Sequence, residues 1–180
     1  MILERTYFFR PATEIAPDLV GKLLCRRLED EVLRMRITET ECYFGSEDTA
    51  CHAHKGRTPR TDIMFKEGGN AYVYLCYGMH FMLNLTTGEE GHPEAVLIRG
   101  VEGADGPGRL TKLLSVNGDQ NRLPLVPESG LWVEDDGFSA DTVALPRVGI
   151  AYASEEDRER LWRFVDQNEW KRRKEAKVRI

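Results

Sequence analysis

The stretch AYVYLCYGMHFMLNLT, residues 71–86, carries the clearest fold signal in this 180-residue chain. Aromatic and branched residues, which favour strands, are abundant on both sides of Tyr77-Gly78, where the chain can reverse. The stretch therefore predicts a β-hairpin with a tyrosine at its tip.

Strand signals continue on both sides of this hairpin. Leu23–Leu28 and Val32–Phe44 flank the polar triplet Glu29-Asp30-Glu31, a pattern that predicts two antiparallel strands joined by a tight turn. Further strands are expected at Glu94–Val101, Leu131–Glu134 and Thr142–Ile150.

Helical signals lie at the periphery of this strand-rich centre. Apolar residues recur at helical spacing over residues 12–20, with Gly21 as a stop, and a glycine-bearing loop at 106–108 precedes a helix-like segment at 109–114. Ser154 followed by Asp157 has the spacing of an N-terminal cap, for a helix expected to include Leu161, Trp162 and Phe164. The sequence predicts an α+β fold: a single domain with a mixed, mainly antiparallel strand-rich core and a protruding β-hairpin, flanked by helices.

Length and composition limit the class of protein. A chain of 180 residues with 41% hydrophobic content fits one domain, expected to span residues 1–180 with a basic C-terminal tail from about residue 167. No apolar run of about 18 residues occurs, and the N-terminus lacks the pattern of a signal peptide. We expect a soluble intracellular protein without membrane contact, located in the cytoplasm and nucleoid of a bacterium or in the nucleus of a eukaryote.

The four cysteines, at positions 25, 42, 51 and 76, contain no C-x-x-C pair, and we expect reduced thiols. Cys51-His52-Ala53-His54 resembles a pair of metal ligands, but a structural zinc needs a second pair, and the remaining histidines are isolated. The sequence therefore predicts no metal and no cofactor.

The formal net charge of −5 disfavours a nucleic-acid partner, because affinity for DNA rests largely on neutralising phosphates. The distribution of charge matters more than the sum. Basic residues gather in three regions, at Lys55, Arg57, Arg60 and Lys66, at Arg99, Arg109 and Lys112, and from Lys171 to Arg179. A one-sided basic face remains compatible with this pattern.

Two carboxylates stand out in the strand predicted at Val32–Phe44. Strand alternation places Ile37, Glu39, Glu41 and Tyr43 on one face. This face is either a solvated strand surface or a site in which a partly desolvated carboxylate beside an aromatic ring acts as a general base on water.

The hairpin offers further candidates. Its row of tyrosines is typical of a core, but Tyr77 and Met79 at the exposed tip resemble the apolar wedges that DNA-bending proteins insert between base pairs. Asn84 and Arg99 interrupt apolar strands, and each needs a polar partner that is either structural or part of a site.

Taken together, these segments resemble the alkyladenine (3-methyladenine, or methylpurine) DNA glycosylase family. The similarity covers residues 6–27, 36–65, 70–86, 95–112 and 146–165. Its motifs are Phe8-Phe9 with Pro11, Glu39-Thr40-Glu41 with Tyr43, Glu47-Asp48 with His52, Thr58-Pro59-Arg60, Tyr72-Val73-Tyr74 with Tyr77-Gly78-Met79 and Asn84, Leu97-Ile98-Arg99, and Arg147-Val148-Gly149.

The resemblance implies roles for particular residues. Glu41 is expected to activate the attacking water, and Arg99 to help hold both the water and the carboxylate. The implied base pocket has Tyr43, His52 and Tyr74 as stacking walls, Asn84 as the residue that excludes guanine, and Val148 near the water-binding end. Tyr77, supported by Met79, is the implied wedge, and Arg57, Arg60, Arg109 and Lys112 are candidate contacts to the DNA backbone.

The implied activity is that of a monofunctional glycosylase of base excision repair. Such an enzyme flips an alkylated or deaminated purine out of duplex DNA and hydrolyses its N-glycosidic bond, with no catalytic lysine and no strand cleavage. We expect a monomer acting on double-stranded DNA that contains damaged purines. One alternative is a non-catalytic binder of damaged DNA, which would not need Glu41. A zinc-dependent deaminase is disfavoured because its H-x-E and P-C-x-x-C signature is missing.

Overall fold

The long strand β2 (Glu31–Phe44) organises the sheet in a computed structural model that describes residues 1–178. Its first half pairs with β1 (Leu23–Leu28), and its second half pairs with β5 (Glu94–Val101). Residues Glu39–Glu41 also pair with β9 (Arg163–Asp166), so this part of β2 has a neighbour on each edge. The centre of β2 is therefore enclosed by backbone.

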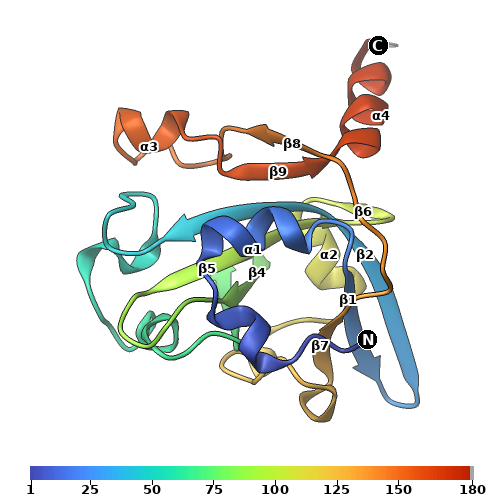
Figure 1. Cartoon of the computed structure of the whole chain (residues 1–180), viewed down its shortest axis with the longest axis horizontal. Coiled ribbons are helices and arrows are strands. Elements are labelled where there is room, and N and C mark those ends of the chain that lie inside the picture. The colour runs from blue at the N-terminus through green and yellow to red at the C-terminus, as the bar shows by residue number, and fades with distance from the viewer. Residues whose placement is uncertain (179–180) are drawn as a thin grey trace.

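The nine-stranded sheet runs in the order β3-β4-β5-β2-β1-β7, with three short strands added at its margins (Figure 1). Every strand pairing between residues 1 and 178 is antiparallel. The remaining strands are β3 (Ala71–Cys76), β4 (His80–Thr86), β6 (Ala104–Asp105), β7 (Leu131–Glu134) and β8 (Thr142–Leu145). The predicted α+β single domain with a mainly antiparallel, strand-rich core is confirmed.

Helices cover the margins of the sheet. Helix α1 (Ala12–Leu19) packs on β2 and β5 through Ile15, Ala16 and Leu19, which are fully buried. The other helices are α2 (Pro107–Leu113), α3 (Glu155–Glu159) and α4 (Gln167–Val178), with short 3-10 turns at Arg5–Phe9, His52–Lys55, Asp62–Phe65, Gly118–Gln120 and Pro127–Ser129. Within residues 1–178, no helix combines the length and apolar character that crossing a bilayer requires.

The predicted hairpin is confirmed as β3 and β4, joined at Tyr77-Gly78. Both turn residues have positive φ, 49° and 68°, which matches the right-handed twist of the flanking strands. Positive φ is costly for a bulky residue, yet Tyr77 occupies it with 91% of its surface exposed. Met79 is 72% exposed, so the tip presents two apolar side chains to solvent.

The strand predicted at Thr142–Ile150 is too long, since β8 ends at Leu145. Pro146 follows and has no N–H to donate to a ladder, so the chain leaves the sheet there. Residues 146–150 instead form a loop that reaches back to β2.

The helix predicted after Ser154 is also too long. The cap itself is confirmed, because Ser154 Oγ accepts a hydrogen bond from the Asp157 N–H at 3.2 Å. Helix α3 ends at Glu159, however, so Leu161 and Trp162 lie beyond it and Phe164 belongs to β9. Hydrogen bonding to β2 on one side and to β8 on the other makes residues 163–166 a strand.

The segment predicted as a basic tail from residue 167 forms α4, which follows directly on β9 (Figure 1). Asp166 Oδ1 accepts hydrogen bonds from the N–H groups of Asn168 and Glu169, at 2.9 and 3.0 Å, and so caps the helix start. The tail prediction beyond Val178 lies outside the described residues.

All four cysteines are free, and Cys25, Cys42 and Cys51 are buried. Burial raises the pKa of Cys25 and of Cys51 to about 12, and that of Cys42 well above its usual value. These side chains are therefore protonated thiols at neutral pH.

Candidate active site

A cavity of about 460 Å³ opens between the hairpin, the 3-10 turn at His52–Lys55 and the loop after Pro146. Its wall also includes residues of β2 and β5, together with Arg60, Met64 of the 3-10 turn at Asp62–Phe65 and Pro107 of α2, so separate parts of the chain converge on it. The structure brings together eight of the predicted site residues around this cavity: Tyr43, His52, Arg60, Tyr74, Tyr77, Asn84, Arg99 and Val148.

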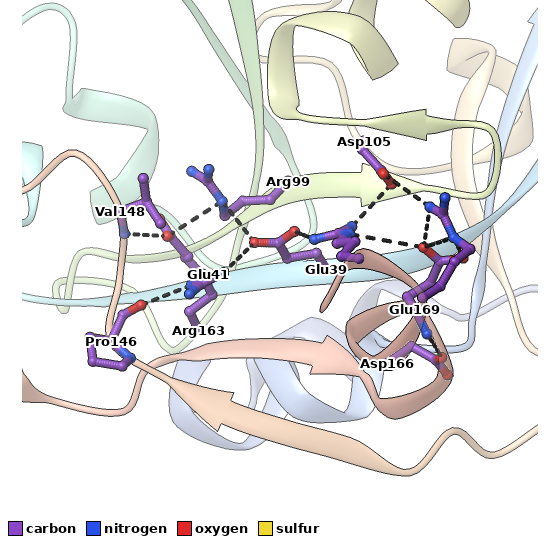
Figure 2. Close-up of polar contacts among 11 residues, drawn as sticks. Glu39, Glu41, Arg99, Asp105, Pro146, Val148, Arg163, Asp166 and Glu169 are labelled. Carbon is purple, nitrogen blue, oxygen red and sulfur yellow. Dashed lines mark hydrogen bonds and ion pairs between the residues drawn. The ribbon is translucent and has the colours of Figure 1, made fainter. Parts of the chain in front are cut away.

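Glu41 lies behind the cavity wall and is completely buried. One carboxylate oxygen accepts a hydrogen bond from the Tyr43 hydroxyl at 2.8 Å, and the other accepts one from the Val148 N–H at 2.8 Å. Arg99 Nε lies 3.4 Å from that second oxygen (Figure 2). Glu41 is thus held by residues that themselves line the cavity.

Burial raises the pKa of Glu41 above its ordinary value. The charge of Arg99 and the hydrogen bonds from Val148 and Tyr43 favour the ionised form and offset part of this effect. A carboxylate with a raised pKa is a stronger proton acceptor than an exposed one, as a general base requires.

Glu39 lies two residues before Glu41 and is 4% exposed. Its oxygens accept hydrogen bonds from Arg99 Nε at 3.2 Å, from Arg163 at 3.1 Å and from Arg173 at 2.5 Å. Burial alone would raise the pKa of Glu39, but Arg173, Arg99 and Arg163 together lower it below its ordinary value. The carboxylate is therefore ionised at neutral pH.

The interpretation of residues 37–43 as a solvated strand face is wrong, because Glu39 and Glu41 are both buried. The predicted common face is also not regular along its whole length. The register between β2 and β5 is irregular from Ile37 to Thr40, and Ile37 packs into the main hydrophobic cluster together with Cys42. Strand alternation alone did not predict this irregularity.

Aromatic rings form one side of the cavity. The His52 and Tyr74 rings lie with centroids 4.6 Å apart, and Tyr72 and Tyr74 lie 5.3 Å apart. Tyr72 was not among the predicted site residues, although it precedes Tyr74 by two positions on the same strand and so shares its face. Its hydroxyl lies 3.0 Å from His52 Nδ1 and helps to fix that ring.

His52 is uncharged at neutral pH. Burial among the surrounding rings lowers the pKa of His52 to about 4, and the charge of Arg60 contributes to the same effect. Arg60 itself lies over the Tyr74 ring, 4.8 Å from its centroid. The aromatic wall therefore carries no charge of its own, with a guanidinium at its edge.

Asn84 and Arg99 combine structural partners with exposure to the cavity. The Asn84 Nδ2 group donates to the backbone oxygen of its cross-strand neighbour Tyr72 at 3.1 Å. Arg99 bridges Glu39 and Glu41. Both side chains also line the cavity, so each has a structural partner, and their part in a site stays a prediction.

The loop that carries Val148 is anchored by Arg147, whose side chain is fully buried. Its guanidinium forms an ion pair with Asp48 at 2.6 Å, and also donates to the backbone oxygens of Cys42 and Asp157. The guanidinium lies 4.9 Å from the centroid of the Tyr43 ring. Arg147 and Asp48 belong to the motifs of the family resemblance, but no role was predicted for either, because their contact joins residues 99 positions apart.

The other predicted residues lie outside this cavity. Arg57 pairs with Asp62 at 2.7 Å, whereas Met79, Arg109 and Lys112 line a second hollow between the hairpin tip and α2. The two hollows are adjacent, since both are lined by Met82 and Pro107.

No group of three or more His, Cys, Asp or Glu side chains that could hold a metal ion occurs among the residues that the structure describes. The Cys51–His54 segment does not gather its side chains at one point. Cys51 is buried, His52 contacts Tyr72, and His54 Nδ1 lies 2.6 Å from the backbone oxygen of Ser46.

The chain is similar to known proteins over most of its length. The family model described as methylpurine-DNA glycosylase matches residues 6–104 and 101–170. A protein of Psychrobacter cryohalolentis is 44% identical over 194 residues, with 91% of each chain covered, and one of Methanocella arvoryzae is 42% identical with 93% of each covered. A third, from Borrelia garinii, is 39% identical with 90% of this chain and 94% of its own covered. All three carry the description "Putative 3-methyladenine DNA glycosylase".

Proposed function

The chain belongs to the methylpurine-DNA glycosylase family, and we propose that it is a monofunctional enzyme that flips alkylated or deaminated purines out of duplex DNA and hydrolyses their N-glycosidic bond. The observation that carries this proposal is the buried carboxylate of Glu41, held by Arg99, Tyr43 and Val148 directly behind a ring-lined cavity. It would act as a monomer, inside the cell, where its DNA substrate lies.

The cavity supports binding of a purine that has left the base stack. Extrusion costs a few kcal/mol, and less when the base is damaged or mispaired. Stacking of the base on Tyr43, His52 and Tyr74 offsets part of that cost, and Tyr77 would fill the gap left in the duplex. An alkylated purine that carries positive charge is attracted to tyrosine faces, and the neutral His52 does not repel it.

Glu41 can serve as the proton acceptor in hydrolysis. The oxygen of water attacks C1′ of the deoxyribose, the bond from C1′ to the purine nitrogen breaks with its electron pair leaving on the purine, and the water proton passes to Glu41. An ionised carboxylate has about four acceptor positions, of which the Tyr43 hydroxyl and the Val148 N–H occupy two, while Arg99 Nε is an ion-pair partner 3.4 Å away. Acceptor capacity therefore remains for the water. The negative charge also stabilises the cationic character that develops on the sugar.

Asn84 would act in selectivity. Its amide is fixed by the hydrogen bond to the Tyr72 backbone at the floor of the cavity. A guanine placed in the cavity would bring the exocyclic amino group on its C2 against this fixed side chain, whereas an adenine-type base carries only hydrogen at C2. The enzyme would thereby exclude undamaged guanine.

Basic residues around the two hollows would contact the DNA backbone. Arg60 lies at the edge of the aromatic wall, and Arg109 and Lys112 are exposed on α2 beside Met79. Arg57 would add to this group, although its pair with Asp62 reduces its contribution. Such local clusters allow DNA binding despite the formal net charge of −5.

A non-catalytic binder of damaged DNA is the alternative function. The placement of Glu41 favours the enzyme, because a buried carboxylate with a raised pKa, held by three residues that line the cavity, suits a general base and is not needed for binding alone. We therefore expect release of free base rather than binding alone.

The experiment is incubation of the protein with duplex oligonucleotides that each carry one lesion: 3-methyladenine, 7-methylguanine, hypoxanthine or ethenoadenine. Free base and abasic sites are scored with and without subsequent alkaline cleavage. The proposal expects free base from at least one duplex, with intact strands until alkali is added. Tight binding to the damaged duplexes without base release would instead identify a binder.

A further inference from the structure

Helix α4 is held against the rest of the protein without an apolar face of its own. It is strongly polar and lacks an apolar face. A helix of 12 residues is marginal in water on its own, so contacts with the rest of the protein must hold it. Those contacts include ion pairs: Arg172 and Arg173 pair with Asp105, at 3.0 and 3.1 Å, and Arg173 also pairs with Glu39. The half-buried Trp170 adds a contact with the Arg163 guanidinium, 5.9 Å from the ring centroid.

Arg173 reaches into the carboxylate region of the proposed site. Its side chain is 19% exposed, and one guanidinium nitrogen donates to Glu39 Oε2 at 2.5 Å. An added Cβ at Gly100 would lie 3.5 Å from the Arg173 guanidinium, an ordinary packing distance, so the guanidinium lies against β5. The contact therefore joins the C-terminal helix to the centre of the sheet.

Glu39 connects Arg173 to the proposed general base. Its other oxygen accepts from Arg99 and Arg163, and Arg99 lies 3.4 Å from Glu41 (Figure 2). The order of charges is thus Arg173, Glu39, Arg99, Glu41. Without Arg173, Glu39 would have only Arg99 and Arg163 as cationic partners among the described residues.

We propose that Arg173 is a positioning residue for Glu41: by neutralising the outer oxygen of Glu39, it keeps Arg99 shared between Glu39 and Glu41. This inference rests on the proposed function. It gives α4 a part in base excision, although the helix does not line the cavity.

The charged and titratable groups around Glu41 come from several elements. Glu39 and Tyr43 lie on β2, Arg99 on β5 and Arg163 on β9, and the Val148 N–H comes from the loop after β8. The negative charge of Glu39 raises the pKa of Glu41, whereas Arg99 lowers it. Removing Arg173 leaves more of the Glu39 charge uncompensated, so the pKa of Glu41 rises further.

The test is the pH dependence of single-turnover base release by full-length protein, compared between wild type, Arg173→Gln and Arg173→Lys. Activity falls at low pH as Glu41 becomes protonated. Arg173→Gln should move this acidic limb upward by on the order of half a pH unit and lower the rate at neutral pH by roughly threefold to tenfold. Arg173→Lys, which keeps the charge, should restore most of the rate.

Arg172→Gln is the matched control, because Arg172 pairs with Asp105 and Glu169 but not with Glu39. The Arg172→Gln variant loses a guanidinium from the same helix and should leave the acidic limb of the pH–rate profile unchanged. The variants Glu39→Gln and Glu39→Gln/Arg173→Gln complete a double-mutant cycle. Once Glu39 is uncharged, the additional loss of Arg173 should change the rate of base release by less than about twofold relative to Glu39→Gln alone.

Equal pH profiles for Arg173→Gln and wild type would overturn the inference, as would an equal effect of Arg172→Gln. The same effect of Arg173→Gln with and without the Glu39 charge would also overturn it, because the coupling would then not pass through Glu39. These outcomes leave the proposed function intact when wild type releases damaged purine. Absence of release by wild type would defeat the proposed function itself, and the inference with it.

Discussion

The hairpin tip and the centre of β2 are opposite environments for functional residues. Tyr77 projects into solvent from the turn between β3 and β4, whereas Glu41 is completely buried between two neighbouring strands. A side chain at the tip can act on DNA without supporting the fold. A side chain at the centre of β2 belongs both to the proposed chemistry and to the packing, so activity and stability should separate at the tip and be coupled around β2.

The largest effect on stability is expected at Arg147, which anchors the loop behind Glu41. Arg147→Met should destabilise the protein by about 3–5 kcal/mol, because it leaves Asp48 buried without its cationic partner. Denaturant unfolding measures the change, with the exposed Arg158→Met as control for loss of a guanidinium alone. A loss below about 1 kcal/mol would show that the loop does not depend on this ion pair.

Glu41→Gln should produce the largest effect on activity. Loss of a general base lowers the rate by at least about 100-fold, and single-turnover release of base from a damaged duplex measures it. The exposed Glu128→Gln serves as control. Release by Glu41→Gln at the parental rate would remove Glu41 from the mechanism.

The same variant tests the coupling to stability. Because the folded-state pKa of Glu41 is raised, its stabilising contribution is present below the ordinary carboxyl pKa of about 4.3 and is lost as pH rises through the folded value. In wild type the free energy of unfolding should therefore fall as pH rises from the ordinary carboxyl pKa through the raised pKa of Glu41. In Glu41→Gln this fall should be smaller, because glutamine does not titrate. An unchanged pH dependence of the unfolding midpoint would contradict the coupling.

Tyr77→Ser should separate activity from stability. It should lower base release from duplex DNA by roughly tenfold to 100-fold, as expected for the loss of about 1–3 kcal/mol of stacking between a base and an aromatic ring. The unfolding midpoint should hardly change, because the side chain is 91% exposed. Tyr77→Phe keeps the ring and should retain activity, and a Tyr77→Ser protein that unfolds while keeping its activity per folded molecule would contradict the wedge role.

Tyr43→Phe is expected to have the smallest effect, a shift in pH dependence. The Tyr43 hydroxyl donates to Glu41 and lowers its pKa, so its removal should move the acidic limb of base release upward by on the order of half a pH unit. Tyr152→Phe removes a hydroxyl from the same cavity wall, one that donates to the Ala50 backbone oxygen, and should leave the limb in place. Identical limbs for Tyr43→Phe and wild type would exclude this contact from the control of Glu41.

The same contrast explains which parts of the molecule could be predicted from sequence. The hairpin and the strands β1, β2, β5 and β7 follow from local patterns of apolar residues and turn residues, and so did the Ser154 cap. Strand β9 could not be found in this way, because residues 163–166 are extended only through pairing with β2 and β8.

Contacts between distant parts of the chain were likewise missing from the predicted site. The sequence contains Arg173 and Glu39, but nothing local joins residues 134 positions apart. The family motifs predicted which residues belong to the site, whereas the contacts that join Glu41 to Arg99 and to the Val148 N–H depend on the folded chain.

The buried thiols have a consequence for a protein that belongs to a family acting on alkylated purines. Alkylating reagents attack a cysteine mainly as its thiolate, and Cys25, Cys42 and Cys51 are both enclosed and held in the protonated form. These three thiols are therefore poor targets for the agents that generate methylated bases, whereas Cys76 is only partly buried.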